Sequence, residues 1–183
     1  MAKIEIDQSG KIEKTEKNTV IAYANSNTRA VFLPRRLKRQ VQEIFRLNGM
    51  HRIYIYFLFA YGVYRLIRNL NQPTNIIIDT EYPGRDKFIT KMIFSLLKES
   101  PATKHQITFK QIGSHPRAHY AAHDVFSNKK SPDEIISLKE VTLAIKNADG
   151  HLRECLSTLV DVQPRRIGYN VTKKLKKVKR RGG

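Results

Sequence analysis

The chain has 183 residues, 40% of them hydrophobic, which suits one domain with a core of its own. Lys and Arg number 34 against 16 Asp and Glu, so the formal net charge is +18 at pH 7. A charge of this size favours a polyanionic partner, and we expect DNA or RNA. The only cysteine, Cys155, excludes an internal disulfide and a cysteine-based metal site, and is typical of a reducing cytoplasm.

No membrane association is expected. The first residues lack the apolar segment of a secretion signal. The longest uncharged run, residues 53–64, is too short to cross a bilayer and is predicted to be buried. We therefore expect a cytoplasmic protein.

Three short strands are predicted first, over residues 3–7, 19–24 and 29–33. Residues 3–7 alternate apolar and polar side chains, and short turn-forming segments separate the three strands. Connections this tight predict an antiparallel meander.

Two helices follow. The first is expected to start with Pro34 at its first position and to run to about residue 47. The second covers about residues 53–70 and is apolar on nearly every side, which indicates burial. Its four tyrosines are therefore interpreted as core residues rather than as platforms for bases; they are Tyr54, Tyr56, Tyr61 and Tyr64.

A strand, a helix and a strand are predicted next. Residues 75–79 form an isoleucine run that is typical of a central strand covered on both faces. Residues 86–99 carry apolar side chains at helical spacing, and residues 107–112 read as a fifth strand. Together they predict a βαβ unit with parallel strands.

The last part of the chain is predicted to be helical and then basic. A helix should begin near Pro116, and Ser137 with Glu140 forms a capping box for the next one. A final helix is expected over about residues 151–160. Residues 165–183 hold nine basic residues and no acid, which predicts a disordered basic tail after a domain of residues 1–164.

Three stretches resemble the ribonuclease H-like superfamily of nucleases and resolvases. They are residues 4–10 (IEIDQSG), residues 76–79 (IIID) and residues 107–124 (ITFKQIGSHPRAHYAAHD). The resemblance implies an α/β fold with a mixed five-stranded sheet, made of three antiparallel strands plus a βαβ unit and flanked by helices. It also allows a homodimer, without deciding the oligomeric state.

The resemblance further implies a nuclease that hydrolyses phosphodiester bonds with two Mg²⁺ or Mn²⁺ ions held by carboxylates. It implies Asp7 and Asp79 as catalytic metal ligands, with Glu43 approaching from the first helix. It leaves the last member of the site open between His119, as ligand or proton carrier, and Asp124, as a further ligand.

Each of these residues also has a structural interpretation. Asp7 and Asp79 stand where turn residues are common. Glu43 lies three residues before Arg46 and could form an ion pair with it on a helix. Glu81, two residues after Asp79, is a weaker candidate ligand.

Nucleic-acid contacts are expected to depend on the backbone and its shape rather than on base sequence. The expected contact residues lie on the first helix, in a loop and in the tail: Arg35, Arg36, Lys38, Arg39, His115, Lys173, Lys174, Lys176 and Lys177. The charge pattern also fits a second function, a non-catalytic nucleic-acid-binding protein that keeps the fold without the chemistry.

Overall fold

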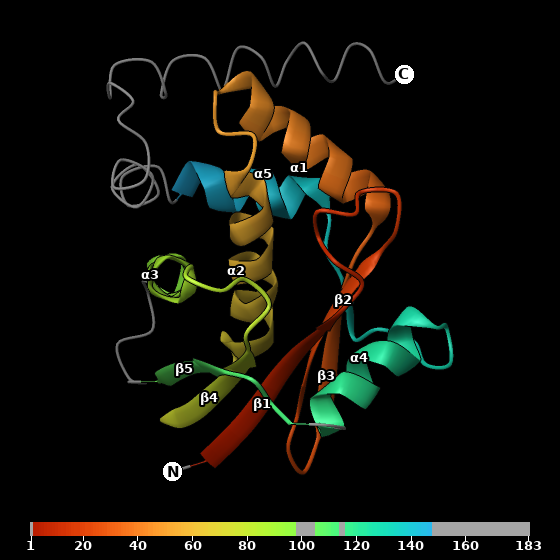
Figure 1. Ribbon diagram of the computed structural model, residues 1–183, viewed down its shortest axis with the longest axis vertical. Coiled ribbons are helices and arrows are strands. Elements are labelled where there is room, and N and C mark those ends of the chain that lie inside the picture. Colours follow the sequence, from red (N-terminus) through yellow and green to blue (C-terminus); the bar gives the residue numbers. More distant parts are fainter. Residues whose placement is uncertain (1, 98–104, 114–115, 148–183) are drawn as a thin grey trace.

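The computed structural model describes residues 2–97, 105–113 and 116–147 (Figure 1). The predicted helix at 151–160 and the tail at 165–183 lie outside these residues. The protein is α/β. Its elements are, in order, β1 (Ala2–Ser9), β2 (Thr19–Ala24), β3 (Thr28–Leu33), α1 (Arg35–Leu47), α2 (Ile53–Ile67), β4 (Thr74–Asp79), α3 (Asp86–Leu96), β5 (Gln106–Lys110), α4 (Arg117–Phe126), β6 (Glu134–Ile135) and α5 (Leu138–Asn147).

One mixed sheet runs through the molecule in the order β5-β4-β1-β2-β3-β6. Strands β1, β2 and β3 form the predicted antiparallel meander. Strands β4 and β5 are parallel neighbours joined through α3, which confirms the βαβ unit. The two parts meet where β4 pairs in parallel with β1 at the centre of the sheet.

The expected number of five strands is wrong, because a short sixth strand extends the sheet. Strand β6 pairs in parallel with β3. Backbone hydrogen bonds hold it there, from Asp133 N to Ala30 O at 3.0 Å and from Ile136 N to Phe32 O at 2.9 Å. A strand of two residues has no periodicity that a sequence pattern could reveal.

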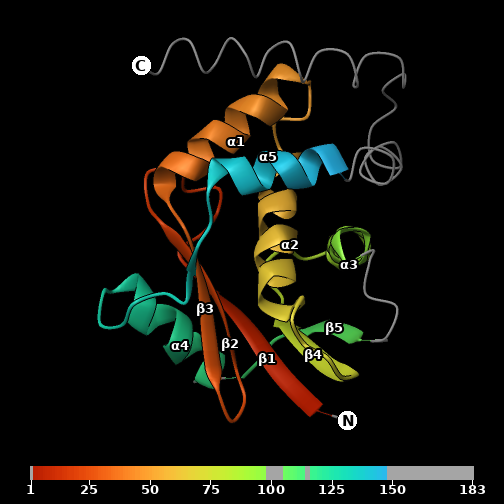
Figure 2. The same cartoon turned by 180° about the vertical axis from the view of Figure 1, so that it is seen from behind.

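Helix α2 covers one face of the sheet, with α1, α3 and α5 around it (Figures 1 and 2). Nearly all its side chains are buried, including Tyr54 and Tyr61 at 3% and 2% exposure, which confirms the core interpretation for these two tyrosines. Gly62 allows the close approach to β2: a Cβ atom there would lie 2.5 Å from Ile21 Cδ1.

Helix α4 covers the opposite face over β1, β2 and β3, where a second and smaller core lies (Figure 2). The residues of this core are small, which brings the helix close to the strands: Val20, Ala22, Ala30, Ala121, Ala122 and Val125. Helix α4 carries His119, one of the candidate site residues.

Strand β4 is central, as predicted, but it is fully covered on one face only. Ile76 and Ile78 are buried beneath α2, whereas Asn75, Ile77 and Asp79 are half-buried. The prediction of cover on both faces is therefore wrong for the described residues, because α4 packs mainly over β1 to β3. Part of this face of the sheet is left accessible beside Asp79.

The helix starts follow the predicted signals with a small shift. Pro34 and Pro116 each stand at the N-cap, one position before the first helical turn. The capping box before α5 is confirmed, since Ser137 N donates to Glu140 Oε2 at 2.9 Å and Glu140 N to Ser137 Oγ at 3.4 Å.

Candidate metal centre

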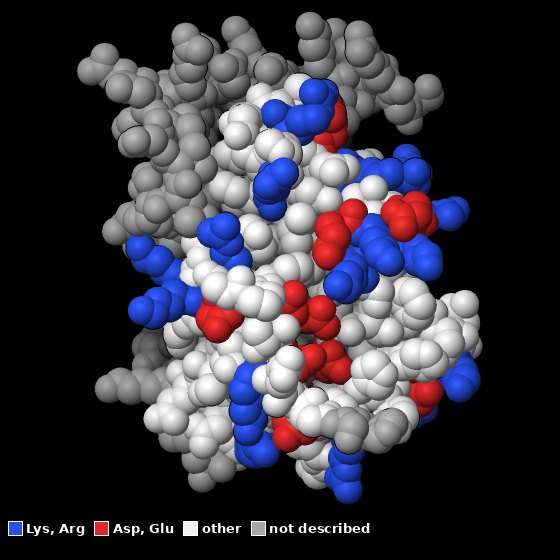
Figure 3. Space-filling view, viewed as in Figure 1, with Lys and Arg blue, Asp and Glu red and all other residues white. Residues whose placement is uncertain are grey.

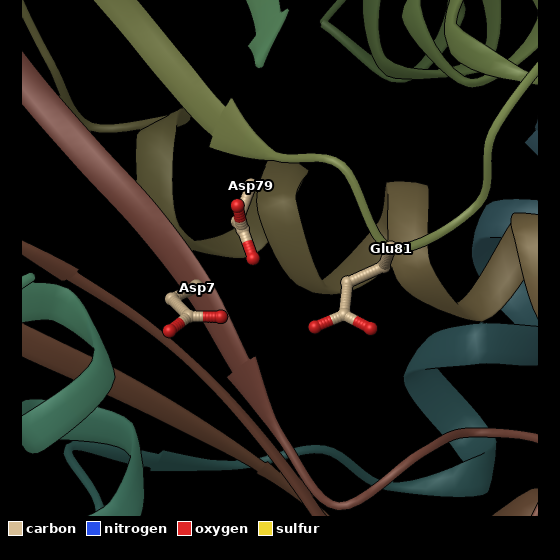
Figure 4. A group of neighbouring side chains, drawn as sticks. All are labelled: Asp7, Asp79 and Glu81. Atoms are coloured by element: carbon tan, nitrogen blue, oxygen red, sulfur yellow. The ribbon is translucent and has the colours of Figure 1, made fainter. Parts of the chain in front are cut away.

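Two aspartates meet where β1 and β4 lie side by side. The parallel register pairs Ile6 with Ile78, and both isoleucines are fully buried on the α2 side. Side chains alternate along a strand, so the next residues, Asp7 and Asp79, point to the opposite face. The sequence pattern Ile-Asp, repeated at the ends of two neighbouring strands, therefore brings two carboxylates together (Figure 4).

Glu81 is the third carboxylate of the cluster. A tight turn follows β4, in which Glu81 N donates a hydrogen bond to Asp79 O at 2.9 Å. Each of the three side chains offers an oxygen atom, and these atoms lie within 4.8 Å of one another. Figure 4 shows the three side chains converging from β1, β4 and the turn. We refer to Asp7, Asp79 and Glu81 as the carboxylate cluster.

Glu81 is a weaker candidate than Asp7 or Asp79 in the sequence, yet the structure places it in the cluster with them. The signal in the sequence was its spacing: a residue two positions after a strand-end Asp can be turned back toward it by a short turn. Only the backbone path decides this, and the path is set by the turn that leads into α3.

Backbone amides hold both aspartates in place. Asp7 Oδ1 accepts a hydrogen bond from Gln8 N at 2.6 Å. Asp79 Oδ1 accepts one from Ile112 N at 2.9 Å, which ties the chain after β5 to the site. Since Asp7 is only 5% exposed, its carboxylate has little freedom to move.

His119 joins the cluster from α4. Its Nδ1 lies 3.0 Å from Asp7 Oδ2, and its side chain is 47% exposed. The imidazole thus touches a buried carboxylate on one side and solvent on the other. The predicted proximity of His119 to Asp7 is present in the structure.

The site is electrostatically costly in the absence of a cation. Burial raises the pKa of Asp7, and the nearby Asp79 raises it further, while Gln8 N and His119 act in the opposite direction. Burial and the neighbouring Asp7 and Asp79 raise the pKa of Glu81 to about 7. Three acids that repel one another in this way are stabilised when a cation lies among them.

The donor set fits a hard divalent cation. Mg²⁺ and Mn²⁺ prefer carboxylate oxygens, and Mg²⁺ binds them at about 2.0–2.1 Å, so ligand atoms on opposite sides of one ion lie about 4 Å apart. The oxygen atoms of Asp7, Asp79 and Glu81 are already within 4.8 Å of one another. A small movement of the side chains would bring them into coordination distance.

Glu43 and Asp124 are not part of the carboxylate cluster. Glu43 lies on the exposed side of α1 and accepts two hydrogen bonds from Arg46, at 2.7 Å and 2.8 Å. Asp124 Oδ2 lies 3.4 Å from Lys130 Nζ. For Glu43 the structure matches the ion-pair interpretation that its sequence position also allowed.

Lys38 corrects the predicted nucleic-acid surface. Its side chain is fully buried, and its Nζ donates to Lys11 O, Lys14 O and Thr19 Oγ1 at 2.8–2.9 Å. It faces the β1–β2 loop, and because it is buried it is not part of the exposed basic surface. The other three predicted residues of α1 are exposed: Arg35, Arg36 and Arg39. His115 and the tail lysines, Lys173, Lys174, Lys176 and Lys177, lie outside the described residues.

Acidic and basic side chains occupy different parts of the face that Figure 3 shows. Acidic side chains gather near its centre, and Lys and Arg side chains lie to either side. Among the cations, Lys11 is close enough to Glu81 to lower its pKa, whereas the neighbouring acids raise it.

In the part of the chain that the structure describes, none of the helices has the length and apolar character needed to cross a membrane.

Comparison of the chain with protein-family models, curated proteins and solved structures finds no match.

Proposed function

We propose that this protein is a metal-dependent nuclease of ribonuclease H-like fold that hydrolyses phosphodiester bonds in DNA or RNA. The observation that carries the proposal is the carboxylate cluster: three acids from two adjacent parallel strands and the following turn, with oxygens within 4.8 Å, in a chain of net charge +18. A basic protein that gathers three acids at one point is suited to hold Mg²⁺ or Mn²⁺ there.

The arrangement of the sheet supports the fold assignment. The resemblance of the sequence implies a meander of three strands and a βαβ unit, with acids at the ends of the first and fourth strands. In the structure these two units share one sheet through the β1–β4 pair, and Asp7 and Asp79 lie at its carboxyl end. The sixth strand is an addition at the β3 edge.

The residues of the site have distinct roles in the proposed reaction. Asp7, Asp79 and Glu81 hold the cations, and Asp7 is fixed by Gln8 N. The bound ions would activate a water molecule and stabilise the leaving oxygen. His119, in contact with Asp7 and half-exposed, moves a proton between the site and solvent. Cations of α1 such as Arg35, Arg36 and Arg39 hold the phosphate backbone.

Cleavage of a labelled panel tests the proposal: an RNA–DNA hybrid, a duplex, a single strand and a four-way junction, each with Mg²⁺ or Mn²⁺. We expect cutting that requires the metal and is lost in both Asp7→Asn and Asp79→Asn. Glu16→Gln, which removes an exposed carboxylate outside the cluster, is the matched control and should cut like the wild type.

Two other outcomes would overturn the proposal. Cleavage that survives Asp7→Asn and Asp79→Asn would remove the carboxylate cluster from the chemistry. Tight, salt-sensitive binding without cutting under either metal would favour the non-catalytic nucleic-acid-binding protein.

The role of Glu43 has a separate test. Loss of cutting in Glu43→Gln would show that Glu43 is a ligand and would contradict its assignment to the ion pair with Arg46.

A further inference from the structure

Helix α4 has two faces of different composition. Its inner face consists of small apolar residues that pack on β1 to β3, among them Ala118, Ala122 and Val125. Its outer face carries three ring side chains, His119, Tyr120 and His123, all exposed. Tyr120 is 50% exposed, so a large part of its side chain is accessible to solvent.

The three rings form a continuous group that begins at the carboxylate cluster. His119 contacts Asp7 at 3.0 Å. The His119 ring lies 5.9 Å from the Tyr120 ring, edge to face, and 6.2 Å from the His123 ring, with the two imidazoles nearly parallel. A surface of exposed rings thus extends from the proposed reaction centre along one helix.

Cations flank this group at both ends of the helix. Arg117, at the first position of α4, and Lys129, three residues after its last residue, are both exposed. Proteins that bind single strands combine aromatic rings, on which bases stack, with basic groups that follow the phosphates. Helix α4 presents both kinds of group within about 15–20 Å.

We infer that the exposed face of α4, formed by His119, Tyr120 and His123, is a stacking platform for unpaired bases. The substrate strand therefore reaches the carboxylate cluster as single-stranded DNA or RNA, or as an unpaired segment of a longer molecule. This inference depends on the proposed nuclease function for its biological meaning. The binding that it describes can be measured without cleavage.

The chemistry of the rings favours unpaired over paired nucleotides. In a duplex each base face is covered by its neighbours, so a protein meets only base edges and the phosphate backbone. Unpaired bases expose their faces and stack on Tyr and His rings. A platform made of ring faces matches the second case, and because every base has such a face, stacking by itself does not select a base sequence.

The test measures equilibrium binding of labelled oligonucleotides in EDTA, so that no strand is cut. The probes are a mixed-sequence DNA strand, the same RNA strand and a blunt DNA duplex. We expect Tyr120→Ala to weaken binding of the single strands by about 5- to 150-fold, the loss that removal of one stacking ring produces. Duplex affinity should change less than about two-fold, and Tyr120→Phe should bind like the wild type.

The matched control is Phe94→Ala on α3. Phe94 is an exposed ring (43%) in an open groove of about 580 Å³ between α3 and β5. We expect it to leave single-strand affinity unchanged. Circular dichroism and the Tm of each variant confirm that the fold is retained. Comparison of the DNA and RNA strands then shows which of the two the platform prefers.

Three results would overturn the inference. Tyr120→Ala could bind single strands as the wild type does, or lose affinity for single strands and duplex equally, or lose no more than Phe94→Ala does. Each result leaves the proposed nuclease function intact as long as Asp79→Asn abolishes cleavage. Failure of the proposed function has its own signature, namely no cutting of any member of the panel by the wild-type protein.

Discussion

The carboxyl group of Glu81 links the pH to the stability of the folded protein. Its pKa is raised from 4.5 to about 7 in the folded protein by burial and by Asp7 and Asp79. Because the folded protein raises this pKa, the fold is more stable when the Glu81 carboxyl group is neutral than when it is charged. The stability that it provides is complete below pH 4.5 and is lost as the pH rises through about 7.

We therefore expect the wild-type protein in EDTA to lose Tm between about pH 5 and pH 8. The side chain in Glu81→Gln cannot ionise, so the Tm of this variant should fall less over the same pH range. At about pH 8 its Tm should be about 2–4 °C or more above that of the wild type. Thermal unfolding followed by circular dichroism measures both proteins. Added Mg²⁺ should raise the Tm of the wild type more than that of the variant. A Tm difference that is the same at every pH would contradict this account.

Lys38 is a second residue whose role differs from its appearance in the sequence. Burial lowers its pKa to about 8, and its ammonium group donates to three oxygens that hold the β1–β2 loop against α1. Lys38→Met removes a charged donor and leaves buried acceptors without it, which should cost about 2–3 kcal/mol of unfolding free energy. Urea denaturation measures this loss.

The neighbouring Arg39 provides the matched control for Lys38. It is exposed on the same helix. Arg39→Met should change the unfolding free energy by less than about 0.5 kcal/mol, and should weaken nucleic-acid binding. Lys38→Met should lower the unfolding free energy and leave nucleic-acid binding unchanged. If Lys38→Met lowered affinity while leaving stability unchanged, the buried interpretation would be wrong.

At the scale of elements, the packing of α2 on the sheet depends on Gly62. A Cβ atom there would lie 2.5 Å from Ile21 Cδ1, so Gly62→Ala has to push the helix from β2 or move Ile21. We expect a loss of about 1–3 kcal/mol. Gly113→Ala, where no atom lies within 4 Å of the added Cβ, should cost much less in the same urea denaturation experiment. Equal losses would show that α2 accommodates the methyl group.

The elements themselves could largely be predicted from the sequence, because their patterns are local. The alternation in β1, the helical spacing in α1 and α3, and the Ser137–Glu140 capping box each depend on a few adjacent residues. The predictions that were wrong concern features that depend on contacts between distant segments. Examples are β6, which is held only by β3 among the described strands, and the half-covered face of β4, which depends on where α4 packs.

The candidate site was predictable to the same degree. Asp7 and Asp79 follow from strand ends that pair in parallel, and His119 from its helix. Glu81 depends on a turn, and Lys38 on the path of a loop, and neither leaves a periodic signal. A basic residue on a helix looks like a surface residue until the oxygens that surround it are known.

At the scale of the whole molecule, the charge is shared between two parts of the chain. Residues 165–183 hold nine of the 34 basic residues and no acid, so their removal lowers the net charge from +18 to +9. We expect this deletion to weaken nucleic-acid binding and to flatten its salt dependence. The slope of log K against log salt should become shallower by about 0.7–0.9 for each phosphate group that the shortened chain no longer neutralises.

Binding titrations at several salt concentrations measure this slope. The control is a chain of full length in which the nine basic residues of 165–183 are replaced by Gln; it should behave like the deletion if charge is the cause. The Tm of both variants should match that of the wild type. A salt slope unchanged by the deletion would exclude the tail from binding.

The pairing of β1 with β4 also has a consequence for the newly made protein. Asp7 leaves the ribosome early, but its partners in the carboxylate cluster, Asp79 and Glu81, are translated only about 4–15 s later. Until β4 has emerged and taken its place beside β1, the chain has no complete set of ligands. Under the proposed nuclease function, a nascent or prematurely terminated polypeptide that lacks β4 is therefore expected to be unable to cut the messenger RNA from which it is being read.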